Sequence, residues 1–222
     1  MFVSTGIKKL DSLIGGGFPV STTVLLSGGP GSGKTLLALK FLNDGIKKKE
    51  KCCYVSLNET RDELLRASKG ILSLSDVEKH IGKNLAIEHI PLGENITMKK
   101  FIDIIASYPK IDRLVIDNVN KLLIFAESER AYRLHLSELV KHLKTMGCTL
   151  LLCETRGDHM DTGNGESFEC DGVVHLSFLE LEEMPKRILT VHKMRYANFN
   201  PKIPHEFVID AKDLKLTETK II

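Results

Sequence analysis

The residues best suited to chemistry in this sequence lie between Gly28 and Thr35 and read Gly-Gly-Pro-Gly-Ser-Gly-Lys-Thr. They fit the G-x-x-x-x-G-K-[ST] pattern of a P-loop, with an apolar run before it and a helical pattern after it. Glycine lets the backbone N–H groups turn inward around a polyphosphate, and the helix that follows directs its free N–H groups at the same anion. We therefore predict an ATP site formed by Gly28, Gly29, Pro30, Gly31, Ser32, Gly33, Lys34 and Thr35.

Two side chains of this loop have separate expected roles. Lys34 would place a positive charge at the β- and γ-phosphates, and the Thr35 hydroxyl would ligate Mg2+. A carboxylate that can share this ion ends the apolar run Arg113–Ile116, in the manner of a Walker B strand. We predict that Asp117, at the tip of this strand, faces Thr35 and holds Mg2+ through water.

The elements that must position these residues follow from hydrophobic periodicity. Apolar runs typical of buried strands alternate with segments whose apolar residues recur at helical spacing. The expected strands are Thr22–Ser27, Cys52–Leu57, Leu85–Ile90, Leu114–Asp117 and Leu150–Cys153, and the expected helices are Lys34–Lys47, Arg61–Ser68, Met98–Tyr108 and Arg130–Met146. This alternation predicts an α/β fold with a mostly parallel central sheet that is flanked by helices on both faces.

The pattern changes after Glu169, where strand-like runs follow one another with short turns between them. These runs are Val173–Leu181, Arg187–Met194, Glu206–Ile209 and Leu214–Thr217. We expect them to form C-terminal antiparallel hairpins that extend the sheet. No linker and no internal repeat divides the sequence, so we expect residues 1–222 to form a single domain.

Composition argues against several classes of protein. The 31 basic and 29 acidic residues give a formal charge of +2, which is no long-range field of the kind that nucleic-acid or membrane-surface proteins carry. No apolar run approaches the ~20 residues of a membrane helix, and the N-terminus lacks the pattern of a secretory signal. The 5 cysteines include no Cys-x-x-Cys pair and indicate reduced thiols. We expect a cytoplasmic protein without membrane insertion.

A longer set of motifs resembles one family. Ser4–Pro19 fits T-G-(I/V)-x-x-L-D-x-(L/I)-(L/I)-G-G-G-(I/F)-P, the segment that leads into the P-loop of KaiC-like and RadA-like proteins. With SGGPGSGKT, VSLNET, LVIDNV and Lys193-Met194-Arg195, the chain resembles a single archaeal-type KaiC-like domain of the RecA superfamily. The resemblance runs, with gaps, from Val3 to Thr217. It implies a RecA-like P-loop NTPase fold and an ATPase that releases ADP and phosphate.

The resemblance also implies roles for residues outside the P-loop. In KaiC-like domains two adjacent glutamates after the second strand polarise the attacking water, and the matching residues here are Asn58 and Glu59. An amide cannot accept a proton, so Glu59 is expected to act alone as the catalytic base. A sensor of the γ-phosphate is expected after the strand that ends at Cys153, among Glu154, Thr155 and Arg156.

Lys193 and Arg195 match a pair that KaiC-like subunits direct at the ATP of the neighbouring subunit. The resemblance therefore implies catalytic help from a second copy of the chain. It predicts a homo-oligomer, either a hexameric ring or an assembly that depends on nucleotide.

Three functions are compatible with these residues. The first is a slowly ATP-hydrolysing KaiC-like protein whose nucleotide state controls assembly and the binding of regulatory protein partners. The second is a RadA-paralogue role in DNA recombination or repair. The third is a non-hydrolysing ATP-binding regulator similar to FlaH, the ATP-binding component of the archaeal flagellar motor. We expect the first, with slow turnover, because Asn58 replaces one of the paired carboxylates and leaves Glu59 as the base.

The DNA role is disfavoured by the segment 157–171, where recombinases of this superfamily place a DNA-binding loop. It contains no lysine or arginine, and its carboxylates are Asp158, Asp161, Glu166, Glu169 and Asp171. Because DNA binding depends on cations that contact phosphates, we expect this acidic segment to repel DNA.

Overall fold

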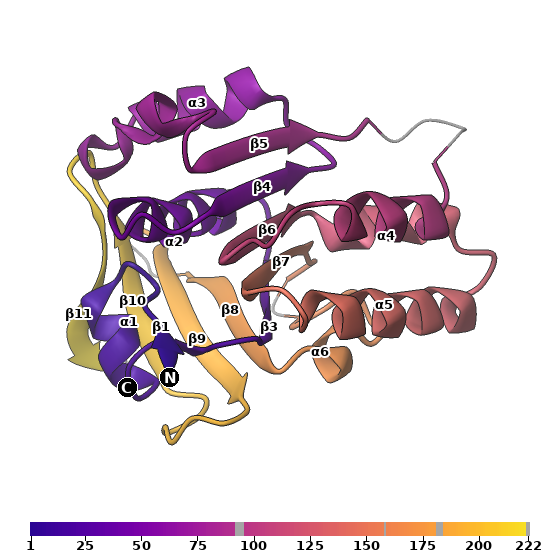
Figure 1. Cartoon of the computed structure of the whole chain (residues 1–222). Coiled ribbons are helices and arrows are strands. Elements are labelled where there is room, and N and C mark those ends of the chain that lie inside the picture. Colours follow the sequence, from indigo (N-terminus) through magenta and orange to yellow (C-terminus); the bar gives the residue numbers. More distant parts are fainter. Residues whose placement is uncertain (92–95, 158, 181–183, 221–222) are drawn as a thin grey trace.

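A large mixed sheet forms the centre of the computed structural model, which describes residues 1–91, 96–157, 159–180 and 184–220 (Figure 1). Within these residues the sheet has nine strands in the order β11-β10-β9-β8-β3-β7-β6-β4-β5. Their bounds are β3 (Thr23–Gly28), β4 (Cys52–Ser56), β5 (Leu85–His89), β6 (Arg113–Asp117), β7 (Cys148–Glu154), β8 (Gly172–Leu179), β9 (Lys186–Met194), β10 (Pro204–Ile209) and β11 (Leu214–Lys220). Strands β3 to β8 pair in parallel, whereas β9, β10 and β11 continue the sheet as antiparallel strands.

Helices cover both faces of this sheet. Their bounds are α1 (Lys8–Leu13), α2 (Lys34–Lys47), α3 (Arg61–Lys69), α4 (Met98–Ala106), α5 (Glu129–Leu143) and α6 (Glu166–Glu169), with the 3-10 helices η1 (Leu72–Leu74), η2 (Val77–His80) and η3 (Val119–Phe125). One hydrophobic core joins α1, α2 and α3 to one face of the sheet, and a second core joins α4 and α5 to the other. Figure 1 shows α2 and α5 on opposite sides of the central strands.

The predicted fold class is confirmed, including the antiparallel extension at the C-terminal end. The helix expected over Met98–Tyr108 ends at Ala106, because Pro109 disfavours a helical backbone at the residue before it. The strand expected to reach Leu181 ends at Leu179, and Leu181 lies outside the described residues. The short helices, and a two-stranded sheet of β1 (Phe2–Val3) and β2 (Phe18–Pro19), were not predicted because such short segments show no hydrophobic repeat.

Parallel pairing brings the ends of four strands to one edge of the sheet, which we call the carboxyl edge. Gly28 at the end of β3 is level with Glu154 at the end of β7, and Ser56 at the end of β4 is level with Asp117 at the end of β6. Polar side chains from distant parts of the sequence therefore meet there. No described helix is long and apolar enough to cross a membrane.

Candidate nucleotide-binding site

The P-loop connects β3 to α2 at the carboxyl edge, and the surrounding strands pack closely against its glycines. A Cβ atom on Gly28, where φ is +152°, would lie 2.3 Å from the carbonyl oxygen of Leu176 in β8. A Cβ atom on Gly33, where φ is +105°, would lie 2.6 Å from Cδ1 of Ile209 in β10. Both positions therefore require glycine for backbone conformation and for space. The antiparallel extension of the sheet thus helps to shape the phosphate loop.

Lys34 begins α2 and turns its ammonium back over the loop. Its Nζ donates hydrogen bonds to the carbonyl oxygens of Gly28 at 2.8 Å and Gly29 at 2.9 Å. Burial lowers the pKa of Lys34, and the nearby carboxylates of Glu154 and Asp117 oppose that effect. The lysine is thus held at the mouth of the loop, where a phosphate group would meet it.

Two buried hydroxyls beside the loop fit an anionic ligand. Ser32 Oγ and Thr155 Oγ1 are both buried and have no hydrogen-bond partner among the described residues. The Thr155 N–H donates to the Gly28 carbonyl at 3.1 Å, which ties the end of β7 to the P-loop. Buried polar atoms usually have partners, so these two hydroxyls suit the oxygen atoms of a bound phosphate.

Asp117 lies opposite Thr35 and collects hydrogen bonds from two elements. Thr35 Oγ1 approaches Asp117 Oδ2 at 3.5 Å, and the buried phenol of Tyr54 donates to the same oxygen at 2.6 Å. Burial raises the pKa of Asp117, although the Tyr54 hydrogen bond and the charge of Lys34 act in the opposite direction. A hydroxyl and a carboxylate are the oxygen ligands that Mg2+ takes from proteins alongside phosphates and water, so the pair fits this ion.

Tyr54 is a residue that sequence reasoning missed. It lies in the middle of β4 with no exposed surface, and its sequence context, Cys52–Ser56, is that of an ordinary buried strand. Only the pairing of β4 with β6 brings its hydroxyl to Asp117. A buried tyrosine usually needs a hydrogen-bond partner, and that general rule was the one available signal.

Glu59 and Asn58 follow β4 at the carboxyl edge and differ in their surroundings. Glu59 is half-buried, and its Oε2 atom is buried without a hydrogen-bond partner among the described residues. Burial raises the pKa of Glu59, and the charges of Asp117 and Glu63 add to the effect. Asn58 is exposed, and its amide oxygen accepts a hydrogen bond from Lys121 Nζ in η3. Sequence reasoning also missed Lys121.

Glu154 ends β7 and Thr155 follows it beside the P-loop, where the sequence led us to expect a γ-phosphate sensor. The Glu154 N–H donates to Asn120 Oδ1 at 3.0 Å, and Asn118 Nδ2 donates to Glu154 Oε2 at 3.5 Å. Glu154, Thr155, Arg156 and Asn120 line part of a cavity with a volume of about 640 Å³. Space for a ligand or for a partner's side chain therefore adjoins the P-loop.

Arg195 lies away from the P-loop of its own chain. The Arg195 N–H donates to the Asp171 carbonyl at 2.9 Å, and the Asp171 N–H donates to the Thr23 carbonyl at 2.8 Å. Arg195 is therefore at the amino end of β3, and Gly28 at the other end is roughly 16 Å away at about 3.3 Å per residue. Its guanidinium lies 3.5 Å from the buried carboxylate of Asp171.

Lys193 is engaged with α6 of its own chain. Its Nζ donates to the carbonyl oxygens of Ser167 at 3.1 Å, Phe168 at 3.3 Å and Cys170 at 2.6 Å. Burial lowers the pKa of Lys193, and the neighbouring charge of Arg195 lowers it further. The P-loop residues, Asp117, Glu59, Glu154 and Thr155 thus come together at the carboxyl edge, whereas Lys193 and Arg195 do not join them.

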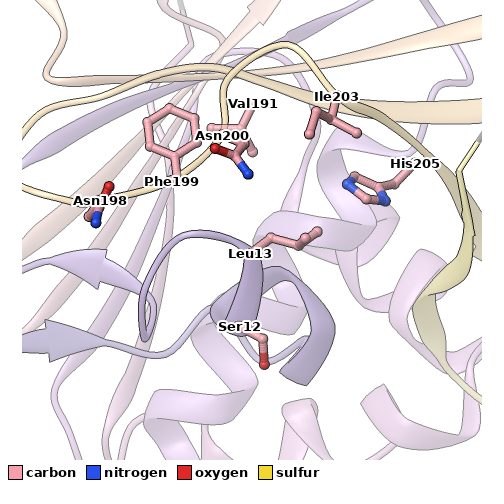
Figure 2. A pocket seen from close by; sticks show the side chains of 8 residues that line it. All are labelled: Ser12, Leu13, Val191, Asn198, Phe199, Asn200, Ile203 and His205. Atoms are coloured by element: carbon pink, nitrogen blue, oxygen red, sulfur yellow. The ribbon is translucent and has the colours of Figure 1, made fainter.

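The chain that follows Arg195 borders a separate hollow of about 410 Å³ (Figure 2). Figure 2 shows Leu13 of α1 on one side of it and Phe199 and Ile203 of the loop before β10 on the other. Asn198, Asn200 and His205 add polar groups to its wall. This hollow is lined by none of the residues predicted for the site.

The acidic segment 157–171 presents less charge than its sequence indicates. Glu166 and Asp171 are both fully buried. Asp171 forms ion pairs with Lys144 at 2.9 Å and with Arg195 at 3.5 Å, so its charge is compensated. Asp158 lies outside the described residues. The repulsion of DNA that was expected from this segment therefore depends mainly on Asp161 and Glu169.

Comparison with known proteins adds evidence independent of this geometry. The sequence matches the family model described as KaiC ATPase over residues 3–221. The UPF0273 protein PH0284 of Pyrococcus horikoshii is 29% identical, and the alignment covers 99% of this chain and 95% of that protein. The circadian clock protein KaiC3 of Synechocystis sp. is 28% identical over 96% of this chain, which corresponds to 43% of its own length. The crystal structure of the KaiC-like protein PH0186 from Pyrococcus horikoshii OT3 matches with a TM-score of 0.85 and 31% identity, covering 98% of this chain and 99% of that one.

Proposed function

Because the chain belongs to the KaiC ATPase family, we propose that it binds ATP with Mg2+ at the carboxyl edge and hydrolyses it slowly to ADP and phosphate. The observation that carries this proposal is the convergence of Lys34, Thr35, Asp117 and Glu59 at one edge, with Thr35 and Asp117 3.5 Å apart. These residues come from three separate segments of the chain, and together they supply a phosphate cradle, a metal-binding pair and a base.

Each residue has a distinct proposed role. The backbone N–H groups of the loop and the ammonium of Lys34 bind the phosphates. Thr35 and Asp117 would hold Mg2+, which neutralises charge on the β- and γ-phosphates. Glu59 orients the attacking water and accepts its proton, and its raised pKa makes it a stronger base than an exposed glutamate. Glu154 and Thr155 lie where they can respond to the γ-phosphate.

We further propose that Lys193 and Arg195 act on the ATP of a neighbouring copy, so that nucleotide state controls assembly. Support comes from their distance from the P-loop of their own chain, which leaves a second copy as the source of any nucleotide they contact. A ring of six copies is the arrangement that this family resemblance favours. Heterologous contacts of this kind, repeated by rotation, generate closed rings.

The test is phosphate release from Mg-ATP, measured together with ATP binding. Lys34→Ala should lose both, and Glu59→Gln should bind ATP normally while its turnover falls by roughly 100-fold or more. Glu138→Gln, on the exposed surface of α5, is the matched control and should behave like the wild type. Wild-type turnover should rise with pH through a value above 4.5, the ordinary pKa of glutamate, since only the ionised carboxylate accepts a proton.

A second candidate function is supported by Asn58 and its contact with Lys121. A cation bound to an amide occupies the position where related ATPases carry a second carboxylate, and this arrangement can bind ATP without activating water. The protein would then be an ATP-binding regulator with little turnover. Tight ATP binding by the wild type without phosphate release would support the regulator, and Asn58→Glu should then gain turnover. Phosphate release by the wild type would support the ATPase instead.

A further inference from the structure

Tyr54 is a buried residue of the site whose hydroxyl has no role in the proposed chemistry. The side chain has no exposed surface, and its ring belongs to the hydrophobic core that joins α2 to the sheet. Phenylalanine would fill the same space without a hydroxyl, and a buried hydroxyl costs free energy unless it is hydrogen-bonded. Packing alone therefore does not account for a tyrosine at this position.

Strand register brings this hydroxyl to Asp117. Ser56 of β4 pairs with Asp117 of β6, and Tyr54, two residues earlier, pairs with Val115. Residues two apart lie on the same face of a strand and are roughly 7 Å apart along it, a distance that a long side chain can span. Tyr54 Oη donates to Asp117 Oδ2 at 2.6 Å, in a hydrogen bond between two buried groups.

A second hydroxyl approaches the same oxygen from α2. Thr35 Oγ1 lies 3.5 Å from Asp117 Oδ2, which is long for a hydrogen bond between oxygen atoms. No hydrogen bond to Asp117 Oδ1 occurs among the described residues. The short bond from Tyr54 is therefore the contact that fixes the orientation of the carboxylate, and Thr35 does not fix it alone.

Tyr54 is suited to hold a carboxylate that must also bind a cation. Burial and the negative charge of Asp117 raise the pKa of Tyr54, and the charge of Glu59 acts in the same direction. The phenol therefore keeps its proton at neutral pH and remains a donor. Unlike a lysine or an arginine, a neutral donor leaves the negative charge of Asp117 uncompensated and available to a metal ion.

We infer that Tyr54 is a positioning residue for Mg2+: its hydroxyl fixes the Asp117 carboxylate opposite Thr35, so that the metal-binding pair is formed before the ion arrives. The inference rests on the proposed Mg-ATP site and adds a residue to it. Partners of this kind orient metal-binding groups, and their loss typically weakens metal binding by 10- to 100-fold. Asp117 keeps its other oxygen, Oδ1, for the ion or for water bound to it.

The test compares the dissociation constants of a fluorescent ATP analogue in EDTA and in Mg2+, whose ratio is the gain in affinity from the metal ion. Tyr54→Phe should leave the affinity in EDTA unchanged and lower the gain by roughly tenfold. Tyr132→Phe is the matched control, because its buried hydroxyl also donates to a carboxylate, that of Glu166 at 3.1 Å, outside the proposed site. This control should keep the wild-type gain.

Ca2+ provides a readout that a merely structural role would not move. Mg2+ requires nearly ideal octahedral geometry, whereas Ca2+ accepts a variable number of ligands at longer distances. A less firmly held Asp117 should therefore reduce the gain from Mg2+ more than the gain from Ca2+ in Tyr54→Phe. An equal loss with both ions, or an equal loss of affinity in EDTA, would mean that Tyr54 supports the fold around the P-loop rather than the orientation of Asp117.

A double variant tests whether Tyr54 acts through Asp117. In an Asp117→Asn background, Tyr54→Phe should cause no further loss of the gain from Mg2+, because the carboxylate that it positions is absent. Losses that simply add would overturn the inference. Fluorotyrosine at position 54 retains the hydroxyl and should retain the gain, and this variant keeps the test decisive if Tyr54→Phe proves unstable in thermal melts.

Failure of this inference differs from failure of the proposed function. If the wild type gains affinity from Mg2+ and Tyr54→Phe gains as much, Tyr54 does not position Asp117, and the Mg-ATP site stands without it. If the wild type binds the analogue equally well in EDTA and in Mg2+, or does not bind it, the proposed metal site is wrong and the role of Tyr54 is wrong with it.

Discussion

Asp117 is the residue on which the polar contacts of the site converge. Tyr54 and Thr35 approach the same carboxylate oxygen, and Lys34 and Glu154 act on it through their charges. Burial raises its pKa, so ionised Asp117 is less stable in the folded protein than in the unfolded chain. A bound cation would remove that disadvantage, so the residue is adapted to a ligand rather than to the stability of the free protein.

Asp117→Asn should therefore raise the thermal midpoint of the nucleotide-free protein at pH 7.5 by a few degrees. A folded pKa above the unfolded value contributes stability that is fully present below the unfolded pKa and is lost as pH rises through the folded pKa. At pH 7.5 the wild type has lost this stability, whereas the variant has no carboxyl group to ionise. The difference in thermal midpoint between the two proteins should therefore shrink as the pH falls toward 3.8, the ordinary pKa of aspartate.

Thermal melts in EDTA at pH 7.5 and 4.5 would measure this difference, and Asp103→Asn on the exposed face of α4 serves as a control. The variant should also lose the additional stability that Mg-ATP confers on the wild type. A lower midpoint for Asp117→Asn than for wild type at pH 7.5 would show that the carboxylate stabilises the free fold.

At the scale of elements, Arg113 connects three parts of the molecule that support the P-loop. This fully buried side chain at the start of β6 donates to the carbonyls of Ser4 at 2.8 Å and Phe41 at 2.7 Å. It also pairs with Asp44 of α2 at 2.9 Å and with Glu50 at 2.5 Å. The N-terminal segment and the helix that follows the P-loop are thereby joined to the sheet.

Arg113→Met should lower the free energy of unfolding by about 3 kcal/mol, because it leaves buried carbonyls and two carboxylates without their cation. The loss falls at the low end of the usual range for buried pairs, since Asp44 and Glu50 keep 25% and 31% of their side chains exposed. Urea denaturation measures the change, with exposed Lys110→Met as control. A loss below about 1 kcal/mol, the scale of surface pairs, would contradict this role.

At the scale of the whole molecule, the residues proposed to act on ATP lie at two opposite edges of the sheet. The P-loop, Asp117 and Glu59 are at the carboxyl edge, whereas Arg195 is joined through Asp171 to the amino end of β3. The rigid parallel strands between them prevent the two groups from meeting within one chain. If Arg195 acts on ATP as proposed, complete sites form only between copies, and activity should depend on protein concentration.

A mixture of two inactive variants tests this division. Arg195→Ala keeps an intact P-loop, and Lys34→Ala keeps an intact Arg195. If Arg195 acts across the subunit interface, a 1:1 mixture should recover ATPase activity, because about a quarter of randomly formed interfaces pair an intact P-loop with an intact Arg195. Adding Lys34→Ala to a Lys34→Ala/Arg195→Ala double variant is the control and should recover nothing. A mixture no more active than its components would mean that Arg195 does not act in this way.

Local sequence determined the P-loop, its flanking strand and helix, Asp117 and the change from parallel to antiparallel strands. Each depends on residues adjacent in the chain, where a glycine pattern or a hydrophobic period directly reflects backbone geometry. The helix Lys34–Lys47 was predicted with its observed bounds for this reason.

Only the tertiary structure decided which distant side chains meet. The hydrogen bond from Tyr54 to Asp117, the burial of Arg113 and the contact of Lys193 with α6 depend on strand order and register, which no local pattern encodes. The same holds for charge, because Asp171 counts as an exposed acid in the sequence but is buried between Lys144 and Arg195 in the fold. Pairing and burial, rather than residue type, set the effect of a charged group.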